Sequence, residues 1–518
     1  MRPDLLVKAA LPPPPAYAPT APAQHAPPPG FGPPPPGTWP THSSPALRDE
    51  APPHPLRWWG LAVIALVQLM VLFDATAFNM ASPAVQADLG MSGDGLTSLF
   101  TAYTVSFGGL LLIGGHLADR AGPRRVLVIG LVGCVLASAI AGVAGGSGQL
   151  LLARFLQGAS AALLTPAALS LVSTGFAGSK ERGRAIGIYA AVAGGGSALG
   201  LLTAGWLDAL SWRVTFYAGA GLAVVALIGA ATLVHERPGR TDARPDTAGM
   251  LLGTGGLIAL SYGLTQADPR GWSDPLVLAL LAVGTVLLAA FLLRQTVRTA
   301  PFPQESGASG LDRLGAFLAV LLAGFGIMTS FAVVEFFLRS VRGDSPLTAG
   351  VAFLPMAAAV AIASTQVSAR LLPRVAPRGL IVSGLAITAL GMVLLTRLEP
   401  DGAYVTQVLP ALLLTGFGTG LALPPVFATA TAGPGLSGER SAAVTAGHQL
   451  GLTLGNALLS AVLVAELRHM SASDDLTSVL FGAYSTALWW AVGGMALACL
   501  ATGLLITSKA PTERPPGR

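Results

Sequence analysis

The chain has 518 residues, of which 52% are hydrophobic and only 11% are charged, and its mean hydropathy is +0.65. A soluble domain carries about 25% charged residues, so little of this protein's surface faces water. The composition therefore excludes an ordinary soluble enzyme or binding domain. The net charge of +5 raises the question of nucleic acid, which the placement of the basic residues answers below.

Residues 1–56 differ in composition from everything that follows. By count, 19 of the 40 prolines lie in this segment, including Pro12–Pro15 and Pro33–Pro36. Such a segment forms polyproline II or remains disordered, because it has no core to bury. It lacks the continuous apolar stretch of a signal peptide. We predict a cytoplasmic tail, with a docking arm for a partner as the alternative.

From Trp58 onward, apolar runs of about 20 residues recur, each long enough to cross a hydrocarbon core about 30 Å thick. Lipid offers no partner to backbone polar groups, so each run must be a helix. The period-two alternation of barrel strands is absent. We therefore predict an all-α integral membrane protein with about fourteen transmembrane helices, near 58–83, 95–117, 126–146, 149–176, 185–207, 214–234, 247–266, 275–295, 314–338, 347–368, 379–397, 403–431, 442–466 and 478–508.

The basic residues predict the orientation of these helices. With the N-terminus in the cytoplasm, the cytoplasmic loops and tails hold 23 of the 30 Lys and Arg residues, the outer loops hold six, and Arg154 lies inside a helix. Such an excess on the cytoplasmic side is typical of membrane proteins. Both termini are predicted to be cytoplasmic, in the plasma or inner membrane. The positive charge is explained by topology and requires no nucleic acid.

Two sequence matches indicate an internal repeat. Leu117–Arg124 and Leu371–Arg378 are identical at four of eight positions, and Gly158, Pro166, Ser179, Glu181 and Arg182 match Gly416, Pro424, Ser437, Glu439 and Arg440. Both matches relate helix n to helix n+8, so the two copies are parallel in the membrane. Parallel repeats are a signature of transporters, whose site lies between them. We predict a tail (1–56), a six-helix bundle (57–234), two inserted helices (235–313), a second six-helix bundle (314–508) and a C-terminal tail (509–518).

The loop between the second and third helices carries the most specific motif. It reads Gly115-His-Leu-Ala-Asp119-Arg120-Ala-Gly122-Pro-Arg124-Arg125. Gly122 permits a tight turn. Asp119 precedes the third helix, whose N-terminal N–H groups favour an anion. The arginines are expected to pair with a neighbouring helix end and close the cytoplasmic face; a basic topology loop without such a role is the alternative.

This motif resembles the signature loop of the major facilitator superfamily, and the helix count resembles its fourteen-helix drug:proton antiporter branch. Supporting matches are spread over residues 58–508. They are Asp74-Ala-Thr76 with Asn79 and Pro83, Arg154-Phe-Leu-Gln157-Gly158, Ser211-Trp212-Arg213 and Gln449-Leu-Gly451. The resemblance implies two bundles that rock about a central cavity and exchange protons for an amphipathic substrate.

Two positions depart from that family's pattern. The fifth helix has Gly200-Leu201 where antiporters carry a Gly-Pro pair, and Ser98 stands where many members have tryptophan. The missing proline leaves proton coupling open. Gly196, Gly200 and Gly205 crowd the same helix, where small residues allow helices to approach closely and slide, although ordinary close packing also accounts for them.

Ionisable residues inside the spans are the candidates for coupling, because each costs a few kcal/mol to insert. Asp74 and Arg154 lie at similar predicted depths and are expected to pair, either for proton coupling or as a static structural pair. Glu335 is a further candidate, with an interfacial ion pair to Arg339, the favourable i,i+4 order, as the alternative. His448 is either a buried, hydrogen-bonded side chain or a proton relay. Tyr103, Gln157 and Gln68 are the remaining candidates for lining the cavity.

The leading hypothesis is a secondary active transporter that exports amphipathic small molecules, such as drugs, antibiotics or a secondary metabolite, against protons. An uncoupled facilitator or importer, and a transporter-like receptor, remain as alternatives. The sequence holds no Gly-x-x-x-x-Gly-Lys-Ser/Thr loop for ATP and no His-Glu-x-x-His zinc motif. We therefore expect no enzyme activity, no metal and no cofactor beyond a proton gradient, with the bilayer and a small-molecule substrate as partners of a monomer.

Overall fold

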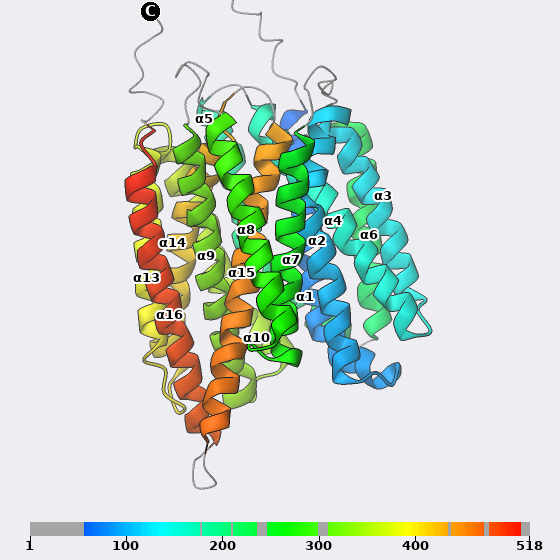
Figure 1. The fold of residues 1–518 in the computed structure, drawn as a ribbon, viewed down its shortest axis with the longest axis vertical. Coiled ribbons are helices and arrows are strands. Elements are labelled where there is room, and N and C mark those ends of the chain that lie inside the picture. Colours follow the sequence, from blue (N-terminus) through cyan, green and yellow to red (C-terminus); the bar gives the residue numbers. More distant parts are fainter. Residues whose placement is uncertain are drawn as a thin grey trace, which may run out of the picture. The chain divides into compact units, whose positions relative to one another are not determined.

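The computed structural model describes residues 56–176, 179–208, 211–235, 246–298, 309–433, 437–470 and 476–508, and the regular structure within them is entirely helical (Figure 1). The predicted tails, 1–56 and 509–518, lie outside the described residues except for Leu56. The end at which the chain turns from the second helix into the third at Gly122 is called the basic end below, and it is uppermost in Figure 1.

The first half of the described chain contains six long helices. Local signals set their limits: the Ser92 hydroxyl accepts a hydrogen bond from Gly95 N at the second helix, and Gly122, with φ +94°, precedes Pro123 at the start of the third. The helices are α1 (Arg57–Asp88), α2 (Gly93–Ala121), α3 (Pro123–Gly142), α4 (Ser147–Gly175), α5 (Ser179–Asp208) and α6 (Trp212–Leu233).

Two further helices lead into the second half, in which several spans are interrupted. The two are α7 (Thr247–Arg270) and α8 (Pro275–Arg298). The elements that follow are α9 (Gly310–Phe336), η2 (Phe337–Val341), α10 (Pro346–Ala352), α11 (Leu354–Ile362), η3 (Ala363–Ser368), α12 (Ala369–Leu371), α13 (Pro377–Leu395), η4 (Tyr404–Val408), α14 (Leu409–Ala430), α15 (Ser437–His469) and α16 (Leu476–Leu505).

Thirteen helical segments of the described chain are long and apolar enough to cross a membrane. The remaining predicted helix, the fifth (185–207), corresponds to α5, whose first turns hold Lys180, Glu181 and Arg182 and which is not among these thirteen. It nevertheless packs along α1, α11 and α14, as a spanning helix of the bundle does. The protein is therefore a multi-pass membrane protein with the predicted arrangement of spans.

The packing of the two halves repeats. In the first half α1 packs on α5, α3 on α4 and α3 on α6; in the second half α9 packs on α15, α13 on α14 and α13 on α16. Each pair is related to its counterpart by the predicted shift of eight helices. The fold is two pseudo-symmetric six-helix bundles with two inserted helices, as the sequence indicated. The bundles meet where α2 and α4 contact α15, and where α5 contacts α10, α11 and α14.

The tenth predicted helix, 347–368, is not continuous. Pro355 starts a new helical segment at α11, and the chain widens into the π-helical turn η3 before α12. Within that turn the Ser364 and Ser368 hydroxyls donate to the carbonyls of Gly420 and Leu421 in α14. These bonds hold the widened turn, which sequence periodicity does not reveal.

The inserted helices lie against the junction of the two bundles. Helix α7 packs on α2 and α15, and α8 packs on α7 and α9 (Figure 1). An ion pair of 3.0 Å between Arg294 Nη2 and Asp246 Oδ1 ties α8 to the start of α7 at the basic end. Helix α7 thus covers the contact between α2 of the first bundle and α15 of the second.

Candidate transport site and gate

The predicted pair in the first bundle is part of a hydrogen-bonded network. Gln157 Nε2 donates to Asp74 Oδ1 at 2.8 Å and to Ser138 Oγ at 3.1 Å. Arg154 Nη1 lies 3.5 Å from Asp74 Oδ2 and donates to Gln157 Oε1 at 3.1 Å. Gln157 therefore bridges the two charged groups. The residues come from α1, α3 and α4, and α4 packs on both of the other helices.

Arg154 is enclosed by aromatic rings on two sides. Its Cζ lies 4.2 Å from the Phe78 ring centroid and 4.3 Å from that of Tyr103. The Arg154 side chain is 1% exposed, whereas that of Asp74 is 11% exposed. Arg154 Nε and the Tyr103 hydroxyl have no hydrogen-bond partner within the described part of the chain. The carboxylate thus forms the accessible side of the network, and the guanidinium lies behind it.

Sequence reasoning found four residues of this network, Asp74, Tyr103, Arg154 and Gln157, and missed two. Phe78 lies four residues after Asp74, so both are on one face of α1, and that spacing was the available signal. Ser138 is fully buried in the middle of α3, a helix whose only candidates, Arg124 and Arg125, lie at its start. A lone serine in an apolar helix is too common to stand out.

At the basic end, Asp119 links the two bundles. Its Oδ1 and Oδ2 accept hydrogen bonds from the backbone N–H groups of Gly438 and Glu439, each at 2.8 Å. These N–H groups belong to the first turn of α15 and have no acceptor within that helix, so a carboxylate is favoured there. The predicted association with the third helix is wrong, because α2 continues to Ala121 and places Asp119 in its last turn, facing α15.

The rest of the loop motif has separate roles. Arg124 donates from Nε to Ala230 O at 3.2 Å and from Nη2 to Ala231 O at 2.6 Å, so it binds the end of α6 as expected of a helix-end clamp. Arg120 and Arg125 are exposed. Gly115 lies directly against Gly438, and a β-carbon at either position would overlap the other's backbone carbonyl.

The candidate glycines of α5 lie at its contact with α1. A β-carbon at Gly196 would meet Leu72, and one at Gly200 would meet Thr76. These contacts fit close packing. Gly205 is also in α5, at a position whose surroundings are not described.

Glu335 and His448 lie outside the Asp74 network. Glu335 pairs with Arg339 at 3.7 Å on the last turns of the ninth span, the interfacial alternative considered above. His448 lies on α15 against Gly324 of α9, and its Nδ1 has no hydrogen-bond partner in the described residues. Gln68 accepts a hydrogen bond of 3.0 Å from the Tyr189 hydroxyl, and the Tyr189 ring packs on Phe427 across the bundle junction.

At the end opposite the basic end, the Ser211-Trp212-Arg213 motif joins α6 to α1. Trp212 Nε1 and Arg213 Nη1 donate to Asp88 Oδ2 at 3.1 and 2.7 Å. The hydrogen bond from Arg213, followed by that from Trp212, lowers the pKa of Asp88 below its ordinary value. This carboxylate is therefore ionised at neutral pH and anchors the loop ends.

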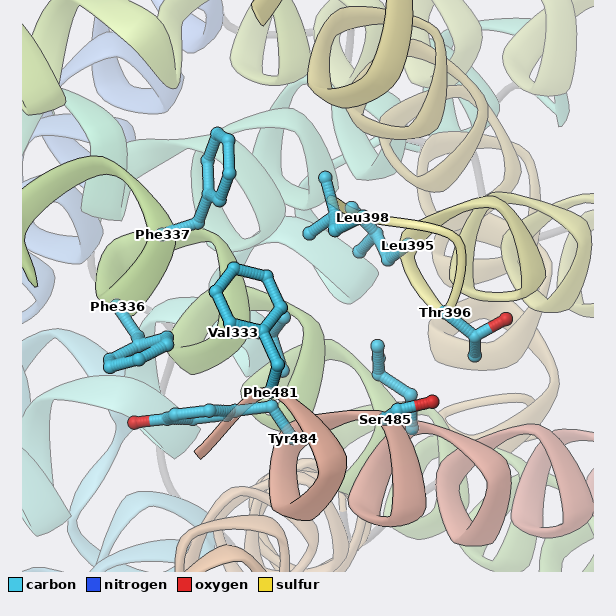
Figure 2. Close-up of a pocket in the computed structure, with 10 residues that line it drawn as sticks. Val333, Phe336, Phe337, Leu395, Thr396, Leu398, Phe481, Tyr484 and Ser485 are labelled. Atoms are coloured by element: carbon cyan, nitrogen blue, oxygen red, sulfur yellow. The ribbon is translucent and has the colours of Figure 1, made fainter. Parts of the chain in front are cut away.

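Neither of the two pockets identified in the described part lies beside Asp74. One, of about 20 Å³, is enclosed by aromatic rings near Glu335; Figure 2 shows Phe481 and Tyr484 of α16 close to Phe336 and Phe337. That volume holds about one water. The other, of about 280 Å³, lies between α2, α4 and α7.

Comparison with known proteins establishes the family. The Major Facilitator Superfamily profile matches residues 64–456. The chain is 43% identical to the puromycin resistance protein of Streptomyces alboniger, covering 88% of this chain and 93% of that protein. It is 35% identical to the cephamycin export protein of Amycolatopsis lactamdurans, over 78% and 84% of the two chains. The solved human organic anion transporter MFSD10 has the same fold, with a TM-score of 0.62, 15% identity, and coverage of 87% and 100%.

The chain belongs to the Major Facilitator Superfamily. It is a multi-pass membrane transporter and not an enzyme.

Proposed function

We propose that this protein exports an amphipathic antibiotic or related secondary metabolite and takes up protons in exchange. The observation that carries the proposal is the Asp74 carboxylate, which lies within an apolar span and is bridged by Gln157 to a buried arginine. An ionisable group at such a position is costly and marks a functional site. Two relatives bear names that speak of puromycin resistance and cephamycin export, which supports efflux of this class of molecule.

The proposed mechanism alternates access to Asp74 from the two ends. With the basic end in the cytoplasm, the contact between Asp119 and α15 holds that end closed. Protonation of Asp74 weakens its attraction to Arg154 and Gln157, since a neutral carboxyl group interacts less strongly with a guanidinium. Substrate binding and proton release then take place at the cytoplasmic side, and substrate release and proton binding take place at the outer side, so the two movements are coupled in opposite directions.

The test uses purified protein in proteoliposomes with an imposed pH gradient, and radiolabelled puromycin as the probe. The proposal predicts that puromycin accumulates in the compartment that is initially acidic and that accumulation stops when the gradient is collapsed with an ionophore. Equilibration without accumulation would identify an uncoupled facilitator. A lack of puromycin movement, with cephamycin and lincomycin also not transported, would contradict antibiotic export.

A further inference from the structure

A second pocket lies on the flank of the first bundle, away from the Asp74 network. It has a volume of about 280 Å³ and lies between α2, α4 and the inserted helix α7. Its wall combines the apolar side chains of Val105 and Phe155 with hydrogen-bonding groups from Thr101, Tyr262 and Gln266. The volume is near the lower limit for small-molecule pockets.

The polar groups of this wall lie within or beside membrane spans. Thr101 is 7% exposed, and its hydroxyl has no hydrogen-bond partner in the part of the chain that the structure describes. Threonine in a helix ordinarily satisfies its hydroxyl on a carbonyl of the preceding turn, as Thr165 does with Ala161. A buried hydroxyl without a partner is costly, so Thr101 is a polar group that a ligand would satisfy.

The pocket depends on the small side chain at position 98. Ser98 lines it, at the position where the sequence departs from the tryptophan of many family members. An indole at this position would occupy the space that the serine leaves open. The open space therefore depends on the serine at position 98, and α7 completes the wall.

The pocket and the Asp74 network lie on different faces of the same two helices. Thr101 and Tyr103 are two residues apart on α2, about 200° around the helix, and Phe155 directly follows Arg154 on α4. Tyr103 covers Arg154 while Thr101 lines the pocket. A molecule in the pocket would thus contact the helix whose other face encloses the guanidinium.

We propose that this pocket is a second binding site for the transported amphipathic molecule, with an apolar body against Val105 and Phe155 and hydrogen bonds to Thr101, Tyr262 or Gln266. The inference rests on the proposed function. A phospholipid is the competing occupant, since the pocket faces the membrane. An acyl chain, however, offers no hydrogen bond to these three side chains, and a two-chain lipid exceeds the volume. The composition of the wall therefore favours a small polar amphiphile.

The test is photolabelling of the full-length protein in lipid nanodiscs, without a gradient, by puromycin that carries a diazirine. Peptide mapping is expected to place adducts on residues 98–105 and 262–266 and to show that unlabelled puromycin displaces them. Ser98→Trp should reduce these adducts at least tenfold, and Thr101→Val should raise the half-saturating concentration about fivefold. Val132→Trp, at an exposed site on α3, is the matched control and should leave both unchanged.

Binding at the pocket and transport are read separately. Adducts in these two segments without puromycin transport would contradict the proposed export of this compound and would leave the pocket as a binding site. Transport without adducts in these segments, or adducts insensitive to Ser98→Trp, would overturn the pocket assignment. Loss of co-purified phospholipid in Ser98→Trp with unchanged puromycin labelling would assign the pocket to lipid and would likewise overturn it. Unchanged unfolding temperatures establish that the variants are folded.

Discussion

At the scale of single residues, the two members of the charged pair inside the membrane have different surroundings. Asp74 accepts a hydrogen bond of 2.8 Å from Gln157 and is partly exposed, while Arg154 is sandwiched between Phe78 and Tyr103. Two aromatic faces partly replace the lost hydration of the guanidinium. The separation of 3.5 Å between the charged groups indicates that the amide, more than direct ion pairing, sets the geometry.

Arg154→Lys tests the importance of the planar cation. A lysine ammonium keeps the charge but lacks the flat fork that stacks between two rings and reaches both Asp74 and Gln157. We expect at least a tenfold fall in puromycin transport rate, equivalent to about 1.4 kcal/mol, in proteoliposomes. Arg125→Lys, at an exposed site, is the control. Equal transport by the two variants would mean that charge alone suffices.

Asp88→Asn tests the anchor between α1 and α6. Because the pKa of Asp88 is lowered, its stabilising contribution is present above the ordinary carboxyl pKa of about 3.9 and is lost only as the pH falls through the lower folded value. We expect a lower unfolding temperature for the variant, with a difference from wild type that stays constant between pH 5 and pH 8. A difference that shrinks within this range would contradict the lowered pKa.

At the scale of helices, the basic end is closed by two contacts of different kinds. On one side Asp119 bonds the N-terminus of α15, while on the repeat-related side α5 packs on α12 and η3. The repeat aligns Asp119 with Pro373, which has no carboxylate and no N–H group. The carboxylate contact of Asp119 therefore has no equivalent carboxylate at the repeat-related position, although the fold is nearly symmetric.

Asp119→Ala is expected to shift the protein towards a state open at the basic end. Hydrogen bonds to a charged group contribute about 1.5–3 kcal/mol each, and part of this is recovered from water when the end opens. A population shift of about tenfold or more should appear as longer distances between spin labels at positions 125 and 374, both exposed at this end, in a background without Cys134 and Cys499. Arg120→Ala is the control. Identical distance distributions in the two variants would show that the hydrogen bonds of Asp119 to α15 do not hold the basic end closed.

Gly158→Ala tests the close approach of α2 and α4 beside the network. A β-carbon at Gly158 would overlap Ser106 Oγ and Tyr103 O, whereas one at Gly148 of the same helix meets nothing within 4 Å. Overpacking of this kind costs about 1–3 kcal/mol. We expect a reduced unfolding temperature and impaired transport for Gly158→Ala, with Gly148→Ala at or above wild-type stability. Equal stability of the two would show that the helices separate freely here.

At the scale of the whole molecule, the features that depend on local composition could be predicted from the sequence. Apolar runs, the distribution of arginine and two repeated motifs predicted the spans and the n to n+8 relation, and the packing of α1 on α5 and of α9 on α15 confirms that relation. Long-range partners were not predictable. Asp119 meets α15 across 319 residues, and the π-helical turn η3 depends on carbonyls of α14 that local periodicity does not reveal.

The candidate site was predictable only in part for the same reason. Asp74 and Arg154 stood out because charge is rare in apolar helices. Phe78 and Ser138 did not, because aromatic and small residues are ordinary in such helices and gain meaning only from their neighbours. The pocket at Ser98 could not be predicted, because it is formed by three helices, including α7, whose packing the sequence does not show. The effect of a serine in place of tryptophan is therefore visible only in the structure.

We propose that Asp74 carries the exchanged proton. This role is tested most directly by proton flux in proteoliposomes, followed with an internal pH indicator as puromycin is added to wild type, to Asp74→Asn and to Asp88→Asn as a carboxylate control. We expect puromycin-dependent proton flux in wild type and Asp88→Asn and its loss in Asp74→Asn, which keeps the shape of the side chain. Wild-type proton flux in Asp74→Asn would contradict it.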